Sequence, residues 1–246
     1  MRVSGLRCND LVTRPPVQFG FMTYSSSTTV AAQRLESATV TRLFVNSYQV
    51  EPQAGAWNWS EVDEAYQQAI AAGLRPLLVA TDAPCWAQTS CNLLFGAPPS
   101  PAHDGDWSAF ITRLVQCYPL AIGIEVWNEP NLAGSFYPQA NPGRYTQLLE
   151  EADKATKAVN PAMPVISGGL AMNGAVGIAA GNYADQTFLT QIFADGALRW
   201  TDGLAVHIYP TVQSGGSEVW DPAVMSQWLG PVERIASAAG APDLPI

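Results

Sequence analysis

The sequence predicts an α/β fold, a TIM-type (β/α)₈ barrel that is incomplete, with about six strand–helix units present. Short aliphatic runs alternate strictly with segments of helical periodicity, an order that produces parallel strands joined by right-handed crossovers. One of these runs is followed two residues later by a glutamate, at the strand end where barrel enzymes carry their functional residues. An open doubly wound sheet is less consistent with the sequence, because no Gly-x-Gly-x-x-Gly opens the first helix.

Six runs rich in β-branched or aliphatic residues are the expected strands. They are Val17–Met22, Thr41–Asn46, Arg75–Ala80, Ile122–Trp127, Met163–Ser167 and Gly203–Ile208. The last residues, 243–246, read as the start of a seventh strand. We therefore expect one barrel domain, residues 1–246, that lacks the last two strand–helix units.

Apolar residues recur at helical spacing between the expected strands. The stripes begin at Val62, Trp107, Tyr145, Phe188 and Met225. Two of the helix starts carry their own signals. Residues 60–63, Ser-Glu-Val-Asp, resemble a capping box, and residues 141–142, Asn-Pro, place a cap residue before a proline at the first helical position.

The overall charge points away from nucleic acid and from anionic membranes. The formal net charge is −9 and the pI is about 4.6, whereas phosphate-bearing partners require a basic face. A neutral substrate fits this composition better. The sequence has no stretch of about 18 apolar residues and no hydrophobic run at its start that is long enough for a signal peptide, so localisation and oligomeric state stay open.

The cysteines predict one short disulfide and no metal site. Cys8, Cys85, Cys91 and Cys117 allow three pairings, and the short spacing favours a bond between Cys85 and Cys91. A zinc site would require close Cys-x-x-Cys pairs or clustered histidines, and the sequence has only two histidines. We expect no metal and no other cofactor.

The most informative segment is residues 123–131, Gly-Ile-Glu-Val-Trp-Asn-Glu-Pro-Asn. Its apolar first part is the expected fourth strand. Pro130 has no backbone N–H and favours extended geometry at Glu129, so the carboxylate of Glu129 is expected at the strand end, facing a cavity. The competing interpretation is a glutamate in a surface ion pair.

With this motif at the end of strand four, the chain resembles the clan A glycoside hydrolases, most closely the bacterial family 39 and family 5 barrels. The resemblance implies that Glu129 is the general acid/base and that Asn128 hydrogen-bonds the 2-hydroxyl of the sugar. It also implies that the nucleophile is a second glutamate at the tip of strand seven, beyond Ile246. Other segments also resemble this family. They are Arg42 on strand two, residues 51–60, residues 83–87, and residues 207–210 at the end of strand six.

The sequence leaves the roles of two charged strand residues, Arg42 and Glu125, open. Arg42 could bridge to the nucleophile or to Glu129, or it could belong to a layer of paired charges inside the barrel. Glu125 shares strand parity with Glu129, and pairing with Arg42 is the more economical interpretation for it because buried charges require partners.

Three further side chains are candidate substrate contacts. His207 and Tyr209 are two residues apart and so face the same side of the strand, where Tyr209 could hydrogen-bond the nucleophile; a packed strand-end tyrosine is the alternative. Trp86 follows strand three and is a candidate platform for the apolar face of a sugar. Core packing is equally consistent for Trp57 and Trp59.

These observations predict a retaining O-glycoside hydrolase that acts on a β-linked oligosaccharide or polysaccharide. A catalytically inactive carbohydrate-binding barrel, or a decayed fragment, is the alternative. A barrel aldolase or phosphate-using isomerase is a third interpretation, but its lysine base or phosphate-binding glycine loop is not visible. The sugar, its linkage, and endo or exo action are not determined by the sequence.

Overall fold

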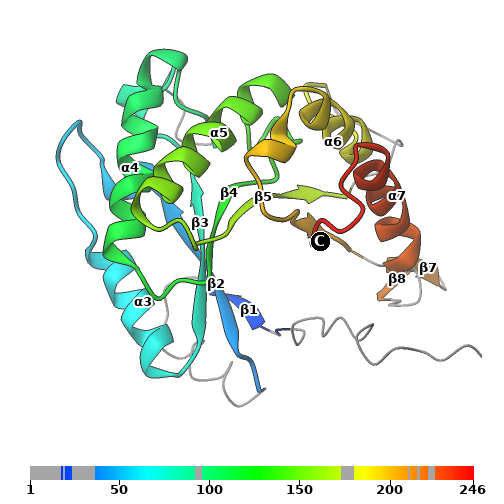
Figure 1. Ribbon diagram of the computed structural model, residues 1–246, viewed down its shortest axis with the longest axis horizontal. Helices are drawn as coiled ribbons and strands as arrows, with labels where there is room; N and C mark the ends of the chain where they lie inside the picture. Colours follow the sequence, from blue (N-terminus) through cyan, green and yellow to red (C-terminus); the bar gives the residue numbers. More distant parts are fainter. Residues whose placement is uncertain are drawn as a thin grey trace, which may run out of the picture.

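The computed structural model describes residues 18, 20–23, 37–91, 96–172, 180–209, 211–214, 217–220 and 225–246. Six strands form one sheet in chain order, and every neighbouring pair is parallel. They are β1 (Gly20–Thr23), β2 (Val40–Asn46), β3 (Arg75–Thr81), β4 (Gly123–Asn128), β5 (Val165–Ala171) and β6 (Val206–His207). The sheet curls into an incomplete barrel, with helices arranged in an arc around its outer face (Figure 1).

The helices follow the strands in the expected alternation. They are α2 (Ser47–Val50), α3 (Ser60–Ala71), α4 (Asp104–Cys117), α5 (Pro142–Val159), α6 (Asp185–Ala194) and α7 (Met225–Ala238). Short 3₁₀ turns lie at Cys85–Ala87, Pro101–His103 and Ala197–Arg199. The incomplete TIM-type barrel expected from the sequence is thus the observed architecture.

The strand limits differ most from the prediction at β5 and β6, and β1, β2, β3 and β4 differ by one residue at their ends. β5 begins two residues later than expected and continues to Ala171, because Gly169 still pairs with Asn128 of β4 although glycine weakens the strand signal. β6 is short, and Gly203 forms only an isolated bridge to Ile166. The early part of the first expected strand, at Val17 and Phe19, lies outside the described residues.

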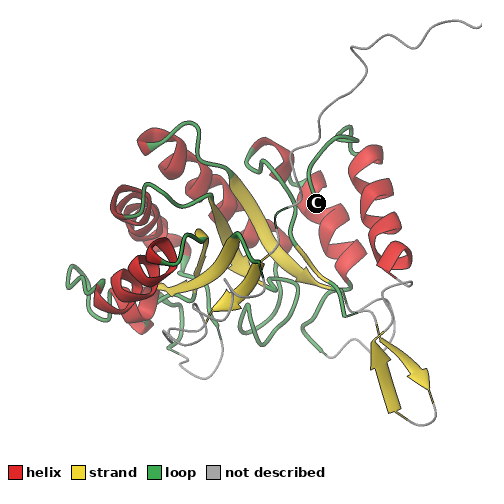
Figure 2. Ribbon diagram, turned by 90° about the horizontal axis from the view of Figure 1, so that it is seen from below, coloured by secondary structure: helices red, strands yellow, loops and turns green. Residues whose placement is uncertain are grey.

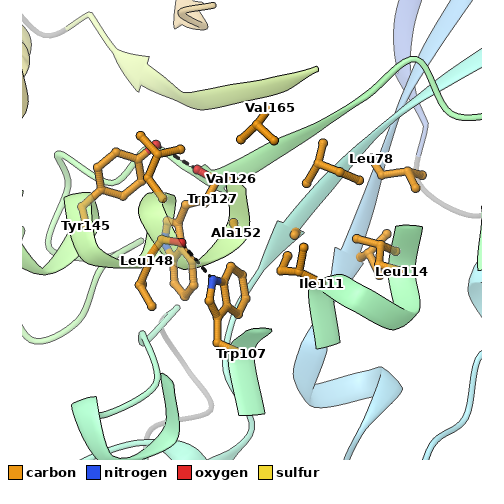
Figure 3. Close-up of a cluster of buried hydrophobic side chains, with 14 of the residues drawn as sticks. Leu78, Trp107, Ile111, Leu114, Val126, Trp127, Tyr145, Leu148, Ala152 and Val165 are labelled. Carbon is orange, nitrogen blue, oxygen red and sulfur yellow. Dashed lines mark hydrogen bonds between the residues drawn. The ribbon is translucent and has the colours of Figure 1, made fainter. Parts of the chain in front are cut away.

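Between the sheet and the helices lies one large apolar core (Figure 3). Alternate residues of β2 enter it, including Leu43 and Val45, because successive side chains of a strand point to opposite faces. Two aromatic side chains of the core use their polar atoms to bind backbone carbonyl groups. The indole of Trp107 donates to the Leu148 carbonyl oxygen at 3.1 Å, and the Tyr145 hydroxyl donates to the Val126 carbonyl oxygen at 3.0 Å.

One helix start matches the prediction and one does not. The side chain of Asn141 accepts a hydrogen bond from the backbone N–H of Arg144, and Pro142 occupies the first helical turn, as expected. The predicted capping box at Ser60 is wrong. The helix begins at Ser60 itself, and its hydroxyl donates to Asn58 Oδ1 instead of accepting from the first turn.

A two-stranded antiparallel hairpin was not predicted. It consists of β7 (Thr211–Ser214) and β8 (Ser217–Trp220) and lies apart from the main sheet (Figure 2). A Gly-Gly dipeptide separates its strands in the sequence, which is a recognised hairpin signal.

Gly168 allows a close approach between β5 and β4. A Cβ atom at this position would lie 2.6 Å from the carbonyl oxygens of both Val126 and Trp127. Real Cβ atoms do not approach backbone oxygens so closely, so any side chain here would push the two strands apart.

We predict that Gly168→Ala lowers the free energy of unfolding by about 1–3 kcal/mol, because the overlap is with rigid backbone atoms. Urea denaturation measures the change. Gly105→Ala is the matched control: a Cβ at this exposed position of α4 meets nothing within 4 Å, and alanine favours the helix. Equal stability of Gly168→Ala and the native chain would contradict the close approach.

Candidate active site

The carboxyl ends of the parallel strands line an open pocket of about 470 Å³, here called the inner pocket. The lining residues belong to β1, β2, β4 and β6 or directly follow β4 and β6. The lining residues are Met22, Arg42, Phe44, Asn128, Glu129, Val206, His207, Ile208 and Tyr209. Five of the six side chains that the sequence marked as functional therefore share one pocket.

Glu129 follows directly after β4, and its carboxyl group lies at the pocket wall. Its Oε1 atom is 2.9 Å from Nδ1 of His207, and the two side chains are 19% and 21% exposed. The backbone N–H of Glu129 donates to the Gly169 carbonyl oxygen at 3.0 Å. The extended backbone expected from Pro130 is wrong, because Glu129 has a φ of +49° in the left-handed region.

The backbone at Trp127 explains why simple strand parity fails near the site. Trp127 has a φ of +76°, and the register between β4 and β5 passes from Val126 to Asn128 without pairing Trp127. Val126 and Trp127 consequently both enter the helix-side core (Figure 3). Glu125 nevertheless faces the barrel interior as Glu129 does, because its carboxylate binds Arg42, and Arg42 lines the inner pocket together with Glu129.

Arg42 and Glu125 form a two-point ion pair inside the sheet. Nε and Nη2 of Arg42 each lie 2.7 Å from an oxygen of Glu125, which is 1% exposed. Nη2 also donates to Oδ1 of Asn128 at 3.1 Å. Of the roles considered for Arg42, the observed one is the paired charge layer, and it extends to the asparagine beside Glu129.

A glycine on β5 completes this arrangement. The backbone N–H of Gly169 donates to Oε1 of Glu125 at 3.0 Å. A Cβ atom at Gly169 would overlap the imidazole ring of His207. Glycine is thus required for His207 to reach Glu129 across the strand.

Trp86 lies away from the inner pocket. Its indole Nε1 donates to the Glu51 carbonyl oxygen at 3.0 Å, and its ring meets the edge of His103. It lines a separate small pocket with Glu51 and Trp107. Trp57 and Trp59 stack with ring centroids 5.9 Å apart and pack against the helix-side core.

A disulfide joins Cys85 to Cys91 in the loop after β3. Cys117 is a free, exposed thiol, and Cys8 lies outside the described residues. Within the described residues, no group of three or more His, Cys, Asp or Glu side chains could hold a metal ion. A helix with the length and hydropathy of a membrane span is not found among the described residues.

Sequence reasoning missed several apolar members of the inner pocket. Phe44 lies two residues after Arg42 on β2 and so on the same face, which was a usable signal. Its ring centroid is 4.7 Å from the Arg42 guanidinium carbon. Met22, whose sulfur accepts from Nη1 of Arg42 at 3.4 Å, carried no comparable signal.

Several solved structures are similar to this chain in fold. A family 39 β-xylosidase from Caulobacter crescentus superposes with a TM-score of 0.64 and 22% identity, covering 91% of this chain and 49% of that chain. A family 39 glycoside hydrolase from Bacteroides cellulosilyticus WH2 has a TM-score of 0.58 and 22% identity, covering 77% and 37%. A GH30 endoxylanase from Clostridium papyrosolvens C71 has a TM-score of 0.59 and 14% identity, covering 92% and 55%.

The fold is that of glycoside hydrolase barrels. At these identities the likeness concerns the fold alone, and the chain spans about half or less of the length of these structures. No protein-family model matches the sequence, and no curated protein matches it.

Asp82 follows directly after β3 and carries a largely buried carboxyl group that lies outside the inner pocket. It has a φ of +55°, and its Oδ1 accepts from the Thr81 hydroxyl at 3.1 Å. Burial raises its pKa from 3.8 to about 6, and the Thr81 hydrogen bond opposes this rise only in part. A Cβ atom at Gly96 would overlap the carboxyl group, so that loop packs directly on it.

Asp82 should make stability depend on pH. Because its pKa is raised in the folded state, the folded protein keeps a proton that the unfolded chain releases between about pH 4 and pH 6, and the free energy of unfolding falls as the pH rises through that range. We predict that Asp82→Asn removes about 3 kcal/mol of this fall. Urea denaturation at a series of pH values tests it, with exposed Asp243→Asn as the control. An unchanged profile in Asp82→Asn would contradict the prediction.

Proposed function

We propose that this chain forms part of a retaining O-glycoside hydrolase for β-linked oligosaccharides or polysaccharides, with Glu129 as the general acid/base. The observation that carries the proposal is the position of the Glu129 carboxyl group. It lies in an open pocket at the carboxyl ends of the strands, beside Asn128 and His207, in a fold shared with glycoside hydrolases. Barrel enzymes carry out their chemistry at this face.

Retaining hydrolysis requires two carboxyl groups about 5–5.5 Å apart. Glu129 is the only carboxylate among the described residues that line the inner pocket, and the carboxylate of Glu125 is bound by Arg42. Glu129 would protonate the leaving oxygen and then accept a proton from water. The nucleophile would be a glutamate outside these 246 residues, as the resemblance to clan A implies.

Asn128 is the proposed contact to the 2-hydroxyl of the sugar. Its Oδ1 atom accepts from Arg42, so its amide NH₂ group is the part that can donate to a substrate hydroxyl. A hydrogen bond at this hydroxyl that strengthens in the transition state contributes to rate and not only to binding. Arg42 would therefore act through Asn128, as a positioning residue.

His207 would position the carboxyl group of Glu129, and Tyr209 would contact the carboxyl group of the nucleophile. The 2.9 Å hydrogen bond from His207 fixes one Glu129 oxygen, which leaves the other to approach the glycosidic oxygen. Tyr209 is 62% exposed at the pocket mouth, where its hydroxyl could contact the nucleophile. Trp86 is not assigned to this pocket, since its indole N–H already binds the Glu51 carbonyl.

In the longest natural protein that contains these residues, Glu129→Gln should reduce hydrolysis of glycosides with poor leaving groups by roughly 10²–10⁴-fold. The first step on an activated aryl β-glycoside should be spared, because such a leaving group does not require protonation. Steady-state and burst kinetics on the two substrate types measure the difference, and Glu64→Gln on exposed α3 is the control.

Equal loss on both substrate types would contradict the assignment of Glu129 as the acid. Saccharide binding without any hydrolysis in the native protein would contradict the enzyme and support the carbohydrate-binding alternative.

A further inference from the structure

A second pocket of about 470 Å³, here called the outer pocket, lies between the connections that follow β3 and β4. Residues 88–90 and 97–101 form one side, and residues 136–139, 141 and 144 form the other. It shares no lining residue with the inner pocket. Both pockets involve the segments that leave the carboxyl end of β4, so they lie on the same rim of the barrel.

The walls of the outer pocket are fixed by several independent contacts. Arg144 of α5 binds the carboxylate of Asp104 on α4 and donates to the Pro99 carbonyl oxygen at 2.8 Å. The backbone N–H of Ser100 donates to the Ala87 carbonyl oxygen at 2.8 Å, and that of Tyr137 donates to the Gly96 carbonyl oxygen at 2.7 Å. The Cys85–Cys91 disulfide closes the loop that carries residues 88–90. A pocket held in this way is formed before any ligand binds.

The lining combines flat apolar surfaces with uncharged polar groups. Tyr137, Pro98 and Pro138 supply ring surfaces, and Gln139 supplies an amide of the kind that can both donate and accept. The amide nitrogen of Gln88 already donates to the Ala83 carbonyl oxygen at 2.7 Å, so Gln88 helps to hold the wall. Arg144 is the only charged lining residue in the part of the chain that the structure describes, and Asp104 offsets its charge. An ionic ligand would meet no unopposed charge here.

From this chemistry we propose that the outer pocket is a second carbohydrate-binding site, which takes one or two residues of a neutral oligosaccharide. A pyranose offers an apolar face for the tyrosine and proline rings and hydroxyls at its edge for the Gln139 amide, and the volume lies within the usual range for small-ligand sites. The inference rests on the proposed function, because a polysaccharide substrate is long enough to engage a site beside the cleft. Occupying both sites would raise the local concentration of substrate at the inner pocket.

The test is an NMR titration of the isotope-labelled 246-residue chain with xylohexaose and, separately, cellohexaose. The proposal predicts amide shift changes in residues 97–101 and 136–144. Tyr137→Ala should weaken this binding about tenfold, the effect of losing one ring contact. Ser90→Trp, a substitution at an exposed rim position, should block it.

Asn128→Ala is the matched control, since it alters the inner pocket and should leave these shift changes intact. Thermal melts verify that each variant is folded. Absence of shifts in these segments at millimolar saccharide, or shifts that survive both outer-pocket variants, would overturn the proposal, as would tighter binding there of a proline-rich peptide probe. Saccharide binding at the outer pocket with no activity from Glu129 in the longer protein would defeat the proposed function and leave this site standing.

Discussion

The ion pair between Arg42 and Glu125 is the interaction on which the arrangement of the inner pocket depends. A carboxylate that is 1% exposed is stable only if it is paired and hydrogen-bonded, and Glu125 receives two contacts from Arg42 and one from the Gly169 N–H. These contacts join β2, β4 and β5 at one level of the sheet. Because the same guanidinium also holds Asn128, the pair determines where the end of β4 presents its polar side chains.

The end of β4 shows a second constraint, in its backbone. Trp127 and Glu129 both have positive φ angles, a conformation that costs free energy for residues other than glycine. The cost is offset by burial of the Trp127 indole against α4 and by the pairing of β4 with β5, where Gly168 and Gly169 leave room. Such strain is concentrated at functional sites. Here it lets the Trp127 side chain enter the core while Asn128 and Glu129 line the inner pocket.

Much of this organisation could be predicted from the sequence, because hydrophobic periodicity and the order of strands and helices are local signals. They gave the parallel half-barrel and placed Arg42, Glu129 and His207 at strand positions that share a pocket. The irregular backbone at Trp127 could not be predicted, since it depends on Gly168 and Gly169, which lie far along the sequence on the neighbouring strand. The place of Trp86 depends likewise on long-range contacts, in particular its hydrogen bond to Glu51.

The most direct test of this account is a double-mutant cycle on the free energy of unfolding, with Arg42→Met, Glu125→Met and the double variant. Each single variant leaves a buried charged group without its partner, so its free energy of unfolding should fall by about 3–5 kcal/mol. The double variant should lose much less than the sum of the two single losses. The exposed Lys154–Glu150 pair, treated in the same way, should be close to additive. Additivity of the Arg42 and Glu125 changes within about 0.5 kcal/mol would contradict the claim that this pair organises the site.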